Sequence, residues 1–167
     1  AAIKLDPSNG DLYTRRGRVL INDGAYEEAL KDLFLAKTYK PQDARIDFYM
    51  GNVYAALGQI TFAIDAYRDA VSKKKNYGEA LIARATQYSK QGKNNLAMAD
   101  YDSAVSGTIY KAERFLYARG KFLLQQNKMS DALLDFVAAR TANAMHSPSW
   151  LAEAETAFDL GQSEKAL

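Results

Sequence analysis

Small residues recur along this chain of 167 residues at an interval that hardly changes. One column consists of alanines separated by 34, 34, 35 and 34 residues: Ala29, Ala63, Ala97, Ala132 and Ala166. Three further columns keep this register: Gly24, Gly58, Gly92, Asn127 and Gly161; Gly17, Gly51, Ala85, Gly120 and Ala154; and Ala36, Ala70, Ala104 and Ala139. Self-similarity at a fixed period of this length indicates a stack of supersecondary units, each covering the apolar face of its neighbour.

Each copy of the repeat is predicted to contain two helices around a tight turn. In the first copy, one helix is expected over Asp11 to Asp23 and the other over Tyr26 to Tyr39. Gly24 lies where a left-handed residue ends a helix, and Pro41 follows the second helix because proline cannot continue one. We therefore expect antiparallel pairs, about ten helices counting the pieces at both ends, and no strand.

The small columns are predicted to mark the places where helices cross closely, because a larger side chain would separate the two backbones. Bulky residues fill the space between these crossings. They are Leu20, Tyr54, Tyr88 and Leu123 on first helices, and Leu33, Tyr67, Tyr101 and Phe136 on second helices. We interpret these residues as core.

The columns resemble those of the tetratricopeptide repeat, a helix–turn–helix unit of about 34 residues with a Trp, Leu-Gly, Tyr, Ala, Phe, Pro pattern. The matching residues are Leu116, Arg119-Gly120, Leu123, Ala132 and Phe136 in the fourth copy, and Trp150 at the start of the fifth. The resemblance implies an all-α, right-handed superhelical solenoid over residues 1–167. It divides the chain into the end of a preceding repeat at 1–9, repeats at 10–43, 44–77, 78–112 and 113–146, and a truncated repeat at 147–167.

Two departures from the repeat pattern are expected to affect the structure. The third repeat holds one additional residue near Gly107-Thr108, which predicts a slightly irregular joint before the fourth. Both ends cut through repeats, as in a fragment of a longer protein, and the last repeat stops early in its second helix. Apolar residues of the terminal segments are therefore expected to be poorly covered and to favour end-to-end contact with a second copy; examples are Leu5, Phe158 and Leu167.

Arginine and aspartate are gained and lost together from repeat to repeat. Repeats one, three and four carry an arginine just before the Gly/Ala column and an aspartate sixteen residues later, where repeat two has Met50 and Ala66. The three combinations are Arg16 with Asp32, Arg84 with Asp100, and Arg119 with Asp135. This pattern predicts structural ion pairs within a repeat or between neighbours, because a guanidinium can bind a carboxylate through two hydrogen bonds.

Two alternatives exist for these arginines and aspartates. They could be independent surface charges. They could also be catalytic carboxylates, but an arginine partner lowers the pKa of a carboxyl group and makes it a poor general acid.

Composition excludes several classes of active site. The chain has no cysteine and a single histidine, His146, which rules out thiolate metal sites and histidine dyads. Asp100-Tyr101-Asp102 begins like a calcium loop but lacks its later Gly and Glu. Lys73-Lys74-Lys75 is interpreted as a solvated helix end. We expect no metal, no cofactor, no enzymatic activity and no membrane insertion, since no apolar run reaches the roughly 18 residues of a span.

The family resemblance implies a partner-binding groove, because its first helices line a concave face where ligand peptides usually lie. The residues carried over to this groove are Arg18, Arg45, Phe48, Asn52, Arg114, Tyr117 and Lys121. Asn52 and Arg114 match two positions of the carboxylate clamp of chaperone-binding members, but the other clamp residues are absent. Cationic residues outnumber Asp11 and Glu79 on this stretch, which favours an acidic partner segment with an apolar anchor.

The predicted function is a non-enzymatic scaffold that binds a protein or peptide segment in this groove. Two alternatives are kept. One is a structural module that self-associates through the ends or outer face of the array. The other is an RNA-binding helical repeat, which the small columns and a net charge of only +2 disfavour.

Overall fold

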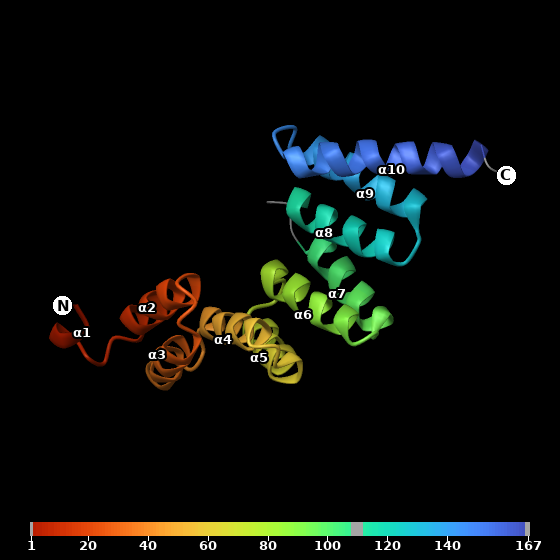
Figure 1. The fold of residues 1–167 in the computed structure, drawn as a ribbon. Coiled ribbons are helices and arrows are strands. Elements are labelled where there is room, and N and C mark those ends of the chain that lie inside the picture. The colour runs from red at the N-terminus through yellow and green to blue at the C-terminus, as the bar shows by residue number, and fades with distance from the viewer. Residues whose placement is uncertain (1, 108–111, 166–167) are drawn as a thin grey trace.

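The computed structural model describes residues 2–107 and 112–165, and these residues form ten helices and no strand. In chain order the helices are α1 (Ala2–Leu5), α2 (Gly10–Asn22), α3 (Tyr26–Tyr39), α4 (Ala44–Ala56), α5 (Ile60–Lys73), α6 (Gly78–Lys90), α7 (Asn94–Ser106), α8 (Ala112–Gln125), α9 (Met129–Ala142) and α10 (Ser147–Lys165). Between α1 and α10 lie four helix pairs, from α2 with α3 to α8 with α9 (Figure 1).

Neighbouring pairs stack in one direction along the chain. The two helices of a pair are antiparallel, each second helix contacts the first helix of the next pair, and first helices contact one another from α2 to α10. Figure 1 shows that the stack curves, with α4, α6 and α8 on the inner side and α5, α7 and α9 on the outer side. The predicted all-α repeat solenoid is therefore confirmed.

Residues with a left-handed backbone end the first helix of all four pairs. Gly24, Gly58 and Gly92 have φ angles of 77°, 72° and 69°, and Asn127 has a φ of 58°. Glycine adopts this conformation without strain, and asparagine tolerates it better than most residues. The left-handed backbone at these turns therefore explains why glycine or asparagine recurs at this position of the repeat.

The fifth position of this column behaves differently, and the expectation of a turn there is wrong. α10 continues as one helix through Gly161 to Lys165, and Gly161 is absent from the residues with positive φ. In the four pairs, a second helix folds back and covers the first. No described helix follows α10 to cover it in this way. Extending α10 therefore satisfies more backbone hydrogen bonds.

The small columns lie at close helix crossings, as expected. The alanines at positions 29, 63, 97 and 132 are all fully buried. In the fourth pair, a Cβ atom added to Gly120 would lie 2.6 Å from Cε1 of Phe136, which is closer than real Cβ contacts. The columns therefore set the distance between helices, and larger residues there would force the pairs apart.

The bulky residues of the second helices form the centre of the array. Leu33, Tyr67, Tyr101 and Phe136 are all buried. Their counterparts on the first helices are less uniform, because Leu123 is buried but Leu20, Tyr54 and Tyr88 are only half-buried. The core thus follows the second helices more closely than the sequence pattern indicates.

Apolar side chains at both ends of the array are exposed. Leu5 is 87% exposed and Phe158 is 67% exposed, in agreement with the poor cover expected for the terminal segments. Leu167 and the additional residue near Thr108 lie outside the described residues, although Gly107 caps α7 just before that joint.

Candidate partner-binding groove

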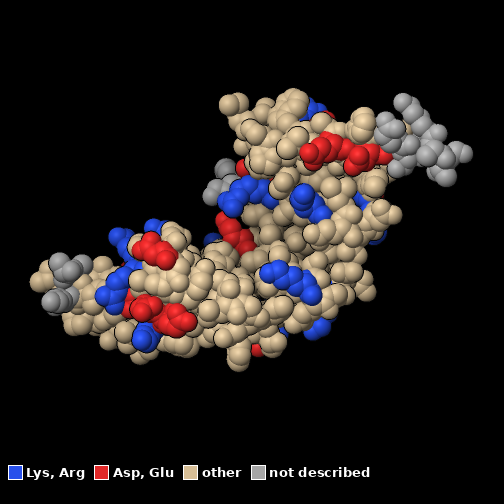
Figure 2. Space-filling model, viewed as in Figure 1, with Lys and Arg blue, Asp and Glu red and all other residues tan. Residues whose placement is uncertain are grey.

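A cavity of about 360 Å³ opens on the inner side of the array, between α4, α6, α8 and the turn before α10. It brings together Phe48, Arg114 and Tyr117, three of the residues expected in the groove. Ile82, Ala83, Phe115 and Ala118 add apolar wall, while Glu79 and His146 add polar groups. The space-filling view shows charged side chains of both signs beside this hollow (Figure 2). We call this space the central cavity.

The aromatic residues of the central cavity are held by the core. The ring of Phe48 lies 5.3 Å from that of Tyr77, and the ring of Tyr117 lies 5.8 Å from Phe136 and 5.5 Å from His146. Both Phe48 and Tyr117 are half-buried. The cavity walls are therefore preformed. Tyr117 belongs both to the cavity wall and to the core, because it also packs against the cluster around Phe136.

Two further cavities extend the central one along α8. One lies between α6, α7 and α8 and is bordered by Thr86, Ala118 and Lys121. The other lies between α8 and α10 and is bordered by Tyr117, Lys121 and Leu151. Because Tyr117, Ala118 and Lys121 are each shared between cavities, the three spaces form one continuous surface.

Arg18 and Arg45 lie in a separate cavity of about 370 Å³ between α2 and α4. Thr14, Arg15, Val19 and Tyr49 complete its wall. We call it the arginine cavity. Arg15 was not identified from the sequence, because it lies outside the slots that the family resemblance carries over.

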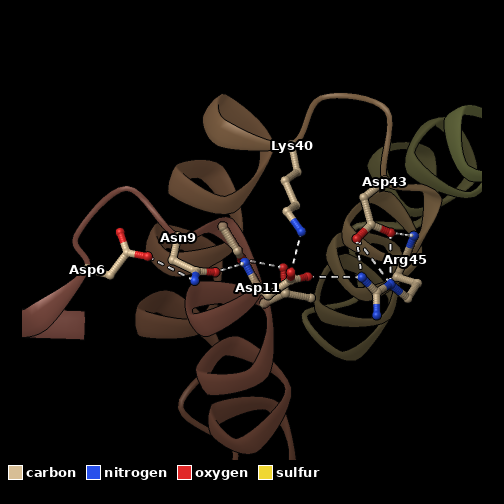
Figure 3. Close-up of polar contacts among 8 residues, drawn as sticks. Asp6, Asn9, Asp11, Lys40, Asp43 and Arg45 are labelled. Atoms are coloured by element: carbon tan, nitrogen blue, oxygen red, sulfur yellow. Dashed lines mark hydrogen bonds and ion pairs between the residues drawn. The ribbon is translucent and has the colours of Figure 1, made fainter. Parts of the chain in front are cut away.

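Arg45 belongs to a network of charges (Figure 3). Its Nε and Nη2 donate to both carboxylate oxygens of Asp43, and Nη2 also donates to Asp11 at 3.2 Å. Lys40 forms a second ion pair with Asp11. The hydrogen bond from Arg45 holds the pKa of Asp43 below its usual value, and the bond from Lys40 does the same for the pKa of Asp11. Arg45 is thus more constrained than a solvated groove residue.

Asn52 does not border any of the four cavities above. Its Oδ1 accepts a hydrogen bond of 2.9 Å from the hydroxyl of the buried Tyr67. One of its polar atoms is thus bonded to the core, and its role as a partner contact stays a prediction.

The three arginine–aspartate combinations form ion pairs within their repeats. Arg16 donates to Asp32 at 2.5 and 2.6 Å, Arg84 donates to Asp100 at 2.7 Å twice, and Arg119 donates to Asp135 at 2.9 and 2.7 Å. All three aspartates are buried, but the side chain of Arg16 is 53% exposed and that of Arg119 is 22% exposed. Each pair joins the two helices of one repeat, and Arg119 also bridges two repeats, because its Nη1 donates to Asp102 on α7 at 2.8 Å.

One buried ion cluster was missed by sequence reasoning. Asp47 is fully buried, and its carboxylate binds Lys37 at 2.7 Å and also pairs with Lys73. The signal was an aspartate in a slot that otherwise holds large residues: Tyr13, Leu81, Leu116 and Trp150. Lys37 of repeat one therefore links to Asp47 of repeat two, and Lys73 is held against the same buried carboxylate instead of forming part of a solvated helix end.

Two kinds of feature are absent from the described part of the chain. No cluster of His, Asp and Glu side chains there could hold a metal ion, and no helix there has the length and apolarity to span a membrane. Asp100 and Asp102, which begin like a calcium loop, bind Arg84 and Arg119 instead.

Comparisons with known proteins agree with this geometry. A family model for the tetratricopeptide repeat matches residues 1–31, and no curated protein matches the chain. PilF of Pseudomonas aeruginosa is 20% identical with a TM-score of 0.83, and the match covers 94% of this chain and 71% of PilF. A thermophilic repeat protein of Thermus thermophilus is 17% identical with a TM-score of 0.81, over 94% of this chain and 86% of that one.

A third similar structure is YrrB, described as a tetratricopeptide-repeat protein with an unusual peptide-binding site. It is 21% identical with a TM-score of 0.71, over 99% of this chain and 85% of YrrB. At these identities the likeness concerns the fold. Together with the family model over residues 1–31, it shows that the chain has the tetratricopeptide-repeat fold.

Proposed function

We propose that this chain is a non-enzymatic scaffold that binds an extended segment of another protein along its inner surface. The tetratricopeptide-repeat fold supports a role in protein interaction. The observation that carries the groove assignment is the continuity of the cavities along α8, which share Tyr117, Ala118 and Lys121. A preformed surface loses little entropy when a partner is ordered onto it.

The central cavity supplies the apolar anchor site of this proposal. Phe48, Ile82 and Phe115 give it an apolar floor, and its volume of about 360 Å³ accommodates one large side chain of the partner. Aromatic walls fixed by the core contribute contact area without losing rotamer freedom on binding. The partner segment should therefore carry an aromatic or large aliphatic residue at its centre.

Charged side chains beside the central cavity determine which partner residues are favoured on either side of the apolar anchor. Within the described part of the chain, the side chains of Arg114 and Lys121 are exposed and have no ion-pair partner. Glu79 is the acidic residue that borders the central cavity. This arrangement favours a partner segment in which acidic residues flank the apolar anchor.

Selection from a random peptide library displayed on phage tests the proposal. Peptides selected on the wild-type protein should lose about tenfold or more in affinity for Ala83→Arg, because the new side chain fills the central cavity. Ala99→Arg is the matched control, since Ala99 is an exposed alanine on α7 that borders none of these cavities. Equal binding by both variants, with helical content unchanged, would contradict the proposal.

End-to-end self-association is a second candidate that one observation favours. Leu5 and Phe158 are exposed large apolar side chains at opposite ends of the array. If these ends bind one another, light scattering over a dilution series should show a concentration-dependent mass, and Phe158→Ser should abolish it. A monomer at every concentration would contradict self-association and leave the groove proposal intact.

A further inference from the structure

We propose that the arginine cavity is a subsite for a pair of neighbouring acidic side chains on the partner segment. The guanidinium groups of Arg15, Arg18 and Arg45 would bind the two carboxylates. This inference rests on the proposed function, because it assigns part of the same inner surface to a second feature of the partner.

The distribution of paired arginines is the first support. The chain has nine arginines, and six of them form ion pairs with described carboxylates: Arg16, Arg45, Arg68, Arg84, Arg119 and Arg140. Within the described part of the chain, the remaining three have no such partner. Two of these, Arg15 and Arg18, border the arginine cavity, and the third, Arg114, borders the central cavity. Arginines without an internal carboxylate thus gather on the inner surface.

The geometry of the arginine cavity suits more than one carboxylate. Arg15 and Arg18 lie three residues apart on α2, so their side chains leave the same face on adjacent turns. Arg45 approaches from α4 on the opposite wall. Asp43 and Asp11 hold the Nε and Nη2 atoms of Arg45, and no described group bonds to its Nη1. This leaves two whole guanidiniums and the Nη1 amino group of Arg45, with two N–H donors, for the ligand.

The surrounding charges favour side-chain carboxylates over a polyanion. Asp11 and Asp43 lie beside Arg45, and the whole chain carries a net charge of only +2. A phosphodiester backbone would meet repulsion from these aspartates on leaving the cavity. Two discrete carboxylates can bind the free guanidiniums and avoid both acids.

The two cavities are close enough for one short segment to reach both. Arg45 and Tyr49 border the arginine cavity, whereas Phe48 on the same helix borders the central cavity. Residues one turn apart on a helix are separated by about 5 Å along its axis. Acidic residues of the partner should therefore lie within a few positions of its apolar anchor.

Titration of the protein with hexaglutamate, followed by NMR of the arginine Nε–Hε groups, tests the subsite without any partner. Saturable shifts are expected at Arg15 and Arg18, and none at Arg84, which is already paired. Arg15→Gln combined with Arg18→Gln should weaken binding about fivefold or more through loss of charge-assisted hydrogen bonds. The control Lys31→Gln with Lys93→Gln removes the same charge at two exposed lysines that border none of these cavities and should weaken it less than about twofold.

Several outcomes would overturn the subsite. These are shifts of equal size at all exposed cations, equal weakening by both double variants, and tighter binding of a phosphoserine peptide or a single-stranded oligonucleotide than of hexaglutamate. Ala83→Arg should leave hexaglutamate binding unchanged, because it fills the other cavity. Failure of the arginine subsite and failure of the central cavity can therefore be told apart.

Discussion

Buried aspartates hold together the two helices of a repeat and, at Asp47, two neighbouring repeats. Each of Asp32, Asp100 and Asp135 is buried against an arginine of the same repeat, and Asp47 is buried against two lysines. The first three could be read from the sequence because arginine and aspartate change together. The cluster at Asp47 could not be read so directly, because Lys37 belongs to repeat one and Lys73 to repeat two.

Loss of one partner should cost most where both are covered. Arg119→Ala should lower the free energy of unfolding by about 3 kcal/mol, because it leaves the buried carboxylate of Asp135 unpaired. Arg16→Ala should cost about 1 kcal/mol or less, since Arg16 is 53% exposed and solvent replaces it. Urea denaturation of both variants measures the difference. Equal losses would contradict a role for burial.

Buried tyrosines should make the array sensitive to alkali. Burial raises the pKa of Tyr77 to about 12, and burial also raises the pKa of Tyr67. Above pH 10 the unfolded state loses these protons first, so the folded state binds more protons and stability falls as pH rises. Tyr77→Phe combined with Tyr67→Phe should flatten this fall between pH 10 and about 12. Thermal unfolding measured across that range would contradict the assignment if the slope stayed the same.

At the scale of helices, the two kinds of small residue have different structural roles. The alanine columns allow close crossings, whereas the Gly and Asn column ends first helices with a left-handed residue. Both roles could be predicted from the spacing alone, because each depends on one local geometry. The end of α10 could not be predicted in this way, because a turn forms only when a second helix can cover the first.

Enlarging a crossing residue should destabilise the array. Ala63→Leu should cost about 1–3 kcal/mol through overpacking at a fully buried site. Ala99→Leu, at an exposed alanine on α7, serves as the control and should change stability by less than about 0.5 kcal/mol. An unchanged melting temperature for Ala63→Leu would show that this column is not a close contact.

Two glycines of the same column should respond to alanine with opposite signs. Gly161→Ala should stabilise the protein by about 0.5–1 kcal/mol, because Gly161 lies inside α10 and nothing lies near its added Cβ. Gly92→Ala should destabilise it by about 1 kcal/mol, because φ is 69° there. Circular dichroism during thermal unfolding gives both signs. Destabilisation by Gly161→Ala would indicate a turn at that position after all.

At the scale of the whole molecule, each pair contacts only its neighbours, so the array is held together by a series of local interfaces. Sequence reasoning placed Phe48, Arg114 and Tyr117 on one surface, and the structure brings them to one cavity. It overlooked Arg15, because slots transferred from a family say only where a backbone lies. They do not show which side chains are hydrogen-bonded to a neighbour, as Asn52 is to Tyr67.

Backbone amide shifts on adding a library-selected peptide test the central claim, binding along the inner surface, most directly. We expect the largest shifts on α4, α6 and α8 around Phe48, Ala83 and Tyr117, which border the central cavity. Residues of α5, α7 and α9 on the outer side should change little (Figure 1). Shifts concentrated on those outer helices, or on the ends of the array around Leu5 and Phe158, would contradict it.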